Sequence, residues 1–268
     1  MIAHLAPLRH ASRDFVARWK GAEVQSATEG RRLEAMIALL VCATIFATAV
    51  LGDASIALAM RDVSPGVKLI FLQITKLGES GWIFAVSFIV LLTSLVARGS
   101  GVGVRLQAAL GLLAGRAFFV ITVNAVSGLL SLAVKVLFGR ARPRLYDVVG
   151  PFHFDVLSVK SSVLSFPSGH SVTAFATATA LAFMAPRAGK ALIGLAILIG
   201  LSRVITGAHY PSDVIAGMAL GVATTIFMRR AFAARGIVFR RRASGLELRG
   251  AGLVWPALRR AALSWSLK

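Results

Sequence analysis

Three short clusters of polar residues carry the side chains that could do chemistry in this chain. They are Lys135 with Arg142 and Pro143, then Pro167-Ser168-Gly169-His170, then Ser202-Arg203 with His209 and Asp213. Each cluster falls at the end of an apolar run long enough to cross a bilayer, where ionisable side chains are costly to keep unless they serve a function. Together they offer three cations, two imidazoles and one carboxylate. This set suits the binding of a phosphate and the breaking of a bond to it.

The first cluster predicts a clamp for phosphate oxygens. Lys135 and Arg142 lie seven residues apart, which is about two turns of a helix, so we expect both side chains on one face at the end of that helix. Pro143 helps to end it, because proline disfavours helical geometry in the residue before it. Arginine offers a planar fork of donors and lysine a point charge. The alternative is that both side chains reach toward lipid head groups.

The second cluster predicts the start of a helix that binds an anion. Ser168 suits the N-cap position, and Gly169 lets the backbone approach a ligand closely. The exposed amides of a helix start favour a bound anion. His170 follows directly, where an imidazole could donate a proton to a leaving oxygen. The alternative is an ordinary helix start with a histidine at the membrane interface.

The third cluster predicts a nucleophile and the group that holds it. His209 and Asp213 lie four residues apart, so the carboxylate can hold one imidazole nitrogen and leave the other to attack. Arg203 adds a third cation. The alternative, that Asp213 only complements the positive end of a helix, leaves Arg203 and His209 without an explanation.

The composition indicates a membrane protein built of helices. The chain has 268 residues, of which 57% are hydrophobic and 15% charged, with a mean hydropathy of +0.77. Soluble domains carry about 25% charged residues. We therefore predict an all-α fold, a polytopic bundle of six transmembrane helices with amphipathic surface helices. The apolar runs that would form the six are 35–52, 82–97, 117–138, 171–186, 191–206 and 212–228.

The positive charge predicts how the chain sits in the membrane. There are 30 Lys and Arg against 11 Asp and Glu, a net charge of +19, and it lies in loops and tails. This favours anionic lipid head groups over nucleic acid as the counter-surface. By the positive-inside rule the basic ends place both termini in the cytoplasm. Loop 139–170 then lies outside, and its cations Arg140, Arg142, Arg144 and Lys160 contradict the rule unless they bind a substrate anion.

The chain divides into three parts: a basic N-terminal segment 1–34, a membrane domain 35–230 and a basic C-terminal tail 231–268. Within the second part, 65–81 is broken by Lys and Gly, which predicts an interfacial or re-entrant helix. The tail could form an amphipathic surface helix or stay partly disordered. The one cysteine, Cys42, excludes an intramolecular disulfide and a cysteine-based metal cluster.

The three clusters in order resemble the signature of the type-2 phosphatidic acid phosphatase superfamily. The pattern is Lys-x6-Arg-Pro, then Pro-Ser-Gly-His, then Ser-Arg-x5-His-x3-Asp, and every position of it matches. The motifs span residues 135–213, and the helix layout extends the resemblance to about 35–230. The resemblance implies a metal-independent phosphatase that works through a phosphohistidine intermediate and needs no cofactor.

The resemblance also implies a role for each motif residue. His209 would be the nucleophile, Asp213 would orient it, and His170 would protonate the leaving oxygen and then activate water. The residues that would hold the phosphate oxygens are Lys135, Arg142, Ser168, Gly169 and Arg203. Outside the motifs, His153 is interpreted as a surface or lid residue, whereas Arg140, Arg144, Tyr146 and Lys160 could recognise the rest of a head group.

The expected partners are the lipid bilayer and a membrane lipid phosphate as substrate, with the oligomeric state left open. The candidates are undecaprenyl diphosphate, phosphatidylglycerol phosphate, phosphatidic acid and a lipid A phosphate. Two other functions remain open: a lipid phosphotransferase that passes the phosphate to another lipid, and a non-catalytic transporter. The arginine-rich termini and the absence of eukaryotic retention signals suggest a bacterial inner membrane, with the active site facing the periplasm.

Overall fold

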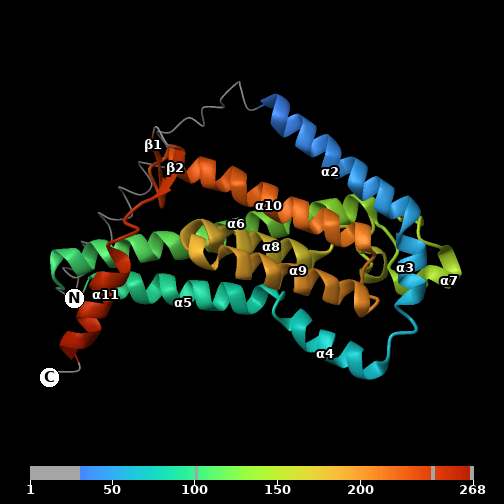
Figure 1. The fold of residues 1–268 in the computed structure, drawn as a ribbon, viewed down its shortest axis with the longest axis horizontal. Helices are drawn as coiled ribbons and strands as arrows, with labels where there is room; N and C mark the ends of the chain where they lie inside the picture. The colour runs from blue at the N-terminus through green and yellow to red at the C-terminus, as the bar shows by residue number, and fades with distance from the viewer. Residues whose placement is uncertain (1–30, 100–101, 243–244, 266–268) are drawn as a thin grey trace. The chain divides into compact units, whose positions relative to one another are not determined.

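The computed structural model describes residues 31–99, 102–242 and 245–265. Most of the predicted N-terminal segment, residues 1–30, lies outside the described residues. The described α-helices are α2 (Arg31–Leu51), α3 (Asp53–Ala59), α4 (Pro65–Lys76), α5 (Ser80–Arg98), α6 (Val104–Phe138), α7 (Tyr146–Val149), α8 (Gly169–Met184), α9 (Gly189–Ile205), α10 (Pro211–Ala234) and α11 (Val254–Trp265) (Figure 1). The predicted helical fold is confirmed.

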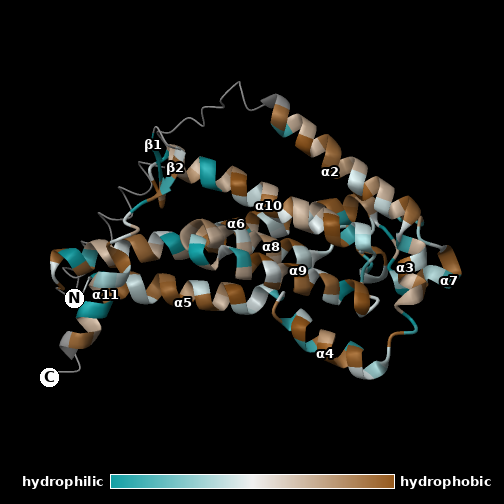
Figure 2. Cartoon of the chain, viewed as in Figure 1, coloured by the Kyte–Doolittle hydropathy of each residue, from teal (hydrophilic) through white to brown (hydrophobic). Residues whose placement is uncertain are grey.

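Five stretches of the described chain are long and apolar enough to cross a membrane. They are Leu33–Leu51, Pro65–Arg98, Val104–Phe138, Pro186–Ile205 and Pro211–Ala234. α2 shows the surface expected of a lipid-facing helix: Leu39, Phe46 and Leu51 are 73%, 72% and 80% exposed, and hydrophobic colours dominate it in Figure 2. The protein is therefore a multi-pass membrane protein. The count of six crossings stays a prediction, because α8 has 16 residues, fewer than the roughly 20 that span a bilayer.

The described residues form two compact units. The first contains 31–80 and 123–225, and it holds all three motif clusters. Its hydrophobic core joins α8 to α9, through residues that include Phe175 and Ile199. Because most of the α8 side chains at this contact are alanine, the two helices approach closely.

Two glycines of α10 bring that helix against the start of α8. A Cβ on Gly217 would lie 2.6 Å from the carbonyl oxygen of Ser168, and one on Gly221 would lie 2.5 Å from that of Val172. No larger residue fits at either place without a shift of the backbone. This spacing of small residues holds the second and third motif clusters side by side.

The second unit contains the remaining described residues. There Phe119 packs edge-on against Phe232 and Phe239, with ring centroids 5.0 and 5.1 Å apart. An antiparallel hairpin pairs β1 (Phe239–Arg242) with β2 (Gly245–Leu248). The all-α prediction missed this hairpin, because its run of arginines reads as a polar tail. For the tail beyond it, the helical alternative is confirmed by α11.

Candidate active site

The third cluster meets at a buried carboxylate. His209 precedes α10 and Asp213 lies in its first turn; they are 4% and 0% exposed. His209 Nδ1 is 3.6 Å from Asp213 Oδ2, which is longer than a direct hydrogen bond. Ser165 lies beside both: its hydroxyl donates to Asp213 Oδ2 at 2.6 Å and is 3.4 Å from His209 Nδ1. The histidine and carboxylate are adjacent as predicted, but no motif pointed to Ser165.

Asp213 also serves the end of its own helix. Its Oδ2 accepts a hydrogen bond from the backbone N–H of Tyr210 at 3.0 Å, so the carboxylate lies where the helix N-terminus favours negative charge. The two interpretations of Asp213 therefore do not compete. The same side chain stabilises the start of α10 and lies next to His209.

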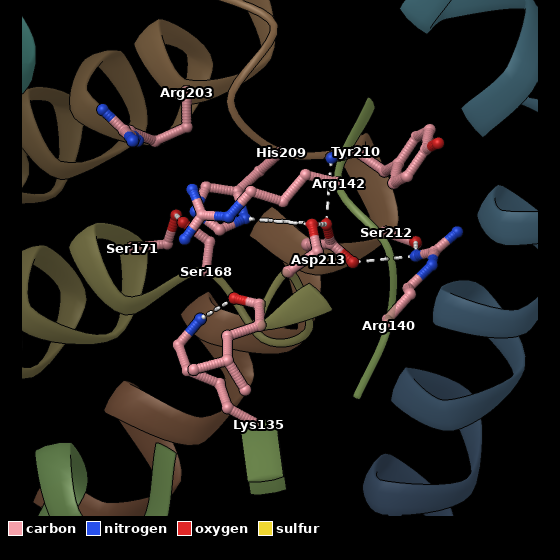
Figure 3. Close-up of polar contacts among 12 residues, drawn as sticks. Lys135, Arg140, Arg142, Ser168, Ser171, Arg203, His209, Tyr210, Ser212 and Asp213 are labelled. Carbon is pink, nitrogen blue, oxygen red and sulfur yellow. Dashed lines mark hydrogen bonds and ion pairs between the residues drawn. The ribbon is translucent and has the colours of Figure 1, made fainter. Parts of the chain in front are cut away.

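Lys135 reaches the site from the last turn of α6. Its Nζ donates to the carbonyl oxygen of Leu164 at 2.8 Å, and its charge interacts with Arg142, Arg203 and Asp213. Figure 3 shows Lys135, Arg142, Ser168 and His209 on one side of Asp213 and Arg140 on the other. The first and third clusters thus converge, as the motif predicted.

Arg142 reaches the site by a different route from the one predicted. α6 ends at Phe138, so Lys135 and Arg142 do not share a helix face. Gly139 ends the helix with φ +59°, and a Cβ there would lie 1.7 Å from the carbonyl oxygen of Asp155, so only glycine fits. Arg142 is extended and its Nε donates to the carbonyl oxygen of Ser161 at 2.9 Å.

Ser168 occupies the predicted N-cap position of α8, but its side chain does not cap the helix. Its Oγ instead accepts a hydrogen bond from the Ser171 hydroxyl at 3.0 Å. Its backbone N–H donates to the carbonyl oxygen of Asp213 at 2.9 Å, which ties the second cluster to the third. Gly169 follows as the first residue of α8, and a Cβ there would lie 3.7 Å from Lys135 Cε.

His170 is half-buried between the turn after α4 and the cations of the site. A Cβ on Gly78 would lie 2.6 Å from Ile199 Cγ2 and 3.3 Å from His170 Cβ. The charges that act on His170 come from Arg203, Lys135 and Arg142, together with His209 when that ring is protonated. Both histidines therefore lie in one electrostatic neighbourhood, as predicted.

Arg203 lies in the last turn of α9 and contacts α4. Its Nη1 donates to Thr75 Oγ1 at 2.6 Å, and in Figure 3 its side chain extends away from His209. Of the three predicted phosphate-binding cations, Arg203 therefore lies toward the edge of the group. Thr75 carries no motif, so sequence reasoning could not find it.

Arg140 is not available to a lipid head group, which corrects the interpretation given to it above. It is 3% exposed, and its guanidinium binds Asp213 Oδ1 at 2.7 Å and Asp53 Oδ2 at 2.8 Å. Arg144, His153 and Lys160 are exposed on the loop, and Tyr146 is half-buried there. Their contact with a head group stays a prediction.

The electrostatics suit a neutral histidine among fixed charges. Burial lowers the pKa of His209 from 6.5 to about 4, and Lys135 and Arg142 act in the same direction, while the Asp213 carboxylate opposes them. The ring is therefore neutral at pH 7, the form in which a nitrogen can attack. Burial also acts against the charge of Arg140, but Asp213 and Asp53 outweigh it and raise the pKa of that guanidinium.

The described part of the chain holds no group of three or more His, Cys, Asp or Glu side chains that could bind a metal ion. The cationic groups are instead the three predicted phosphate ligands and Arg140. Two of them, Lys135 and Arg142, act electrostatically on His209, so these side chains can neutralise an anion bound beside that ring.

Comparison with known proteins agrees with this fold. The sequence-family model of the PAP2 superfamily matches residues 116–237 of this chain. The lipid A 1-phosphatase of Rhizobium johnstonii is 44% identical over 122 residues, 46% of this chain and 50% of that protein. The lipid A 1-phosphatase of Rhizobium etli is 34% identical over 175 residues, 65% of this chain and 75% of that protein. The chain belongs to the PAP2 superfamily, as its three motifs predicted.

A solved structure shares the fold. The transmembrane PAP2-type phosphatidylglycerolphosphate phosphatase of Bacillus subtilis aligns with a TM-score of 0.51 and 23% identity, over 72% of this chain and 91% of that chain. At that identity the likeness concerns the arrangement of helices. The match to the Rhizobium johnstonii protein spans half of that relative's length.

Proposed function

We propose that this chain is an integral membrane lipid phosphatase that forms a phosphohistidine at His209. The observation that carries the proposal is the buried His209, which lies 3.6 Å from Asp213 and within the electrostatic reach of Lys135 and Arg142. Phosphoryl transfer depends mainly on positioning and on neutralising the equatorial oxygens. The site supplies both from side chains.

The proposed reaction has two steps. In the first, His209 Nε2 attacks phosphorus, the bond to the lipid oxygen breaks, and His170 gives that oxygen a proton. Burial and the neighbouring cations lower the pKa of His170 to about 4 in the free site, so this ring gains its proton when the phosphate anion binds and offsets those cations. In the second, His170 takes a proton from water, the hydroxide displaces His209, and inorganic phosphate leaves. Lys135, Arg142 and Arg203 bind the phosphoryl oxygens in both steps, with the Ser168 side chain and the Gly169 amide.

The proposed substrate is the phosphate of a membrane lipid at the periplasmic face of a bacterial inner membrane, with both termini cytoplasmic. The 1-phosphate of lipid A is the first candidate, because both Rhizobium relatives are lipid A 1-phosphatases. The apolar spans at Leu33–Leu51 and beyond would hold the enzyme in the same bilayer as the acyl chains of such a substrate.

The test is phosphate release by purified protein in detergent from a panel of lipid phosphates: lipid A, undecaprenyl diphosphate, phosphatidylglycerol phosphate and phosphatidic acid. We expect release with wild type and none with His209→Ala, which still inserts and folds. A His170→Ala variant should accumulate a phosphoenzyme that is stable to alkali and labile to acid, as phosphohistidine is. Full activity of purified His209→Ala would remove the nucleophile assignment.

A further inference from the structure

The start of α10 is held by a charged residue from a distant part of the chain. Asp53, the first residue of α3, is fully buried. Its Oδ1 accepts a hydrogen bond from the backbone N–H of Ser212 at 3.0 Å, and its Oδ2 accepts one from the Ser212 hydroxyl. Ser212 directly precedes Asp213. Asp53 therefore fixes the turn of helix from which the Asp213 carboxylate projects.

Arg140 links the two carboxylates. Its Nη1 donates to Asp213 Oδ1 at 2.7 Å and to Ser212 Oγ at 2.7 Å, and its Nη2 donates to Asp53 Oδ2 at 2.8 Å. The carbonyl oxygen of Pro151 accepts from Nε and Nη2 at 3.2 and 3.1 Å. The ring of Tyr210 lies 4.4 Å from the guanidinium carbon. Arg140 is thus held from several sides with little freedom to turn.

The charges of the cluster formed by Asp53, Arg140 and Asp213 do not cancel. Asp53 and Asp213 carry two negative charges and Arg140 one positive charge, which leaves a net charge of −1 behind His209. A pair of Arg140 and Asp213 alone would be neutral. The Asp213 carboxylate would then offer little compensation to a histidine ring that becomes positive when its Nε2 bonds to phosphorus.

We propose that Asp53 and Arg140 are positioning residues that set the orientation and the net negative charge of Asp213 for attack by His209. This inference rests on the proposed function, in which His209 is the nucleophile. Arg140 holds Oδ1 of Asp213 and so turns Oδ2 toward His209 and Ser165. Asp53 restores the charge that Arg140 would otherwise cancel.

The experiment changes the charge of the cluster in both directions. Asp53→Asn makes it neutral, Arg140→Gln makes it −2, and the double variant returns it to −1. The other charged and titratable groups near His209 stay constant in all three: Lys135 of α6, Arg142 of the loop and His170 of α8. Arg203 of α9, which acts on His170, is also unchanged. Asp147→Asn is the matched control, because it removes an exposed partner of Arg61 at 3.0 Å.

The first readout needs no substrate. The pKa of His209, followed by NMR of carbon-13-labelled histidine, should fall in Asp53→Asn, rise in Arg140→Gln and return toward wild type in the double variant. If Asp53 and Arg140 only stabilised the fold, their substitution would lower the midpoint of thermal unfolding in detergent without shifting the pKa of His209 in opposite directions. Shifts of the same sign in both single variants would overturn the proposal. Where Asp53→Asn does not fold, a pKa that fails to rise in Arg140→Gln overturns it equally.

The second readout is turnover. We expect kcat of Asp53→Asn to fall at least tenfold with KM changed less than twofold, a partial recovery in the double variant, and no change in Asp147→Asn. Wild-type kcat in folded Asp53→Asn would overturn the proposal. Failure of the wild type to form a phosphohistidine would instead contradict the proposed function, while the NMR result would still report on the cluster.

Discussion

The hydroxyl of Ser165 donates a hydrogen bond to Oδ2 of Asp213 over 2.6 Å, two residues before the Pro-Ser-Gly-His motif begins. The same hydroxyl lies 3.4 Å from His209 Nδ1. The histidine and its carboxylate, which are 3.6 Å apart, are therefore bridged by a side chain from another segment. The family resemblance assigns the orientation of His209 to Asp213 alone. Ser165 would share that role.

Ser165→Ala should lower kcat by about tenfold to a hundredfold with little change in KM. The expected loss corresponds to one hydrogen bond to a charged group, about 1.5–3 kcal/mol. Ser158→Ala is the control, since that hydroxyl accepts a hydrogen bond from the backbone N–H of Lys160 in the loop. Equal kcat for the two variants in a phosphate-release assay would show that Ser165 contributes nothing to turnover.

Gly217→Ala should destabilise the protein by about 1–3 kcal/mol, because the added methyl would press on the carbonyl oxygen of Ser168 at 2.6 Å. Gly194→Ala is the matched control, because a Cβ there meets nothing within 4 Å and alanine favours a helix. Thermal unfolding in detergent measures both. A midpoint for Gly217→Ala as high as that of Gly194→Ala would mean that α10 does not press on α8 at this place.

The acid limit of activity should lie well below the ordinary pKa of histidine. The attacking ring of His209 must be neutral, and its pKa is lowered to about 4, so the nucleophile is lost only as the pH falls toward that value. At pH 5.5 a histidine of ordinary pKa would be about nine-tenths protonated. The measurement is kcat/KM against pH, corrected for the ionisation of the phosphate substrate. An acid midpoint near 6.5 would contradict it.

Activity should not change when divalent ions are removed by EDTA. The proposed phosphate ligands are the side chains of Lys135, Arg142 and Arg203, which carry their own positive charge. The measurement is phosphate release before and after dialysis against chelator. Loss of turnover that magnesium or another divalent ion restores would require a metal in the reaction.

Loop 139–170 should be accessible from the periplasm. The chain has one cysteine, Cys42, so a variant with Cys42→Ala and Lys160→Cys, at an exposed position, reports the side of this loop. We expect labelling of intact cells by an impermeant maleimide. Labelling only after the membrane is opened would reverse the topology and the leaflet that the enzyme serves.

The sequence predicted the parts of the site that lie in short motifs. Lys135 in the last turn of a helix, Ser168 at an N-cap and His209 near Asp213 all follow from local spacing. The same spacing misplaced Arg142, because it could not reveal that Gly139 turns the chain out of α6. Gly139 ends α6 in a left-handed conformation and lies against the carbonyl oxygen of Asp155. Local spacing cannot predict a tertiary contact of this kind.

The contacts that Arg140 makes with Asp53 and Asp213 could not be predicted from the sequence. Asp53 and Arg140 are 87 residues apart, and no pattern around either indicates that they meet. Arg140 lies in a basic loop beside Arg142 and Arg144, where a solvent-exposed cation is the natural interpretation. Only the folded chain shows that one of these arginines turns inward while another lies exposed.

The position of Asp53 in the chain has an evolutionary consequence. The match to the PAP2 superfamily begins at residue 116, so this acid lies before the matched region. The three motifs alone therefore do not specify whether a protein has an acid at the position of Asp53. Under the positioning role proposed for Asp53, exchanging the first eighty residues between two such chains would alter catalytic speed even though every signature residue stayed the same.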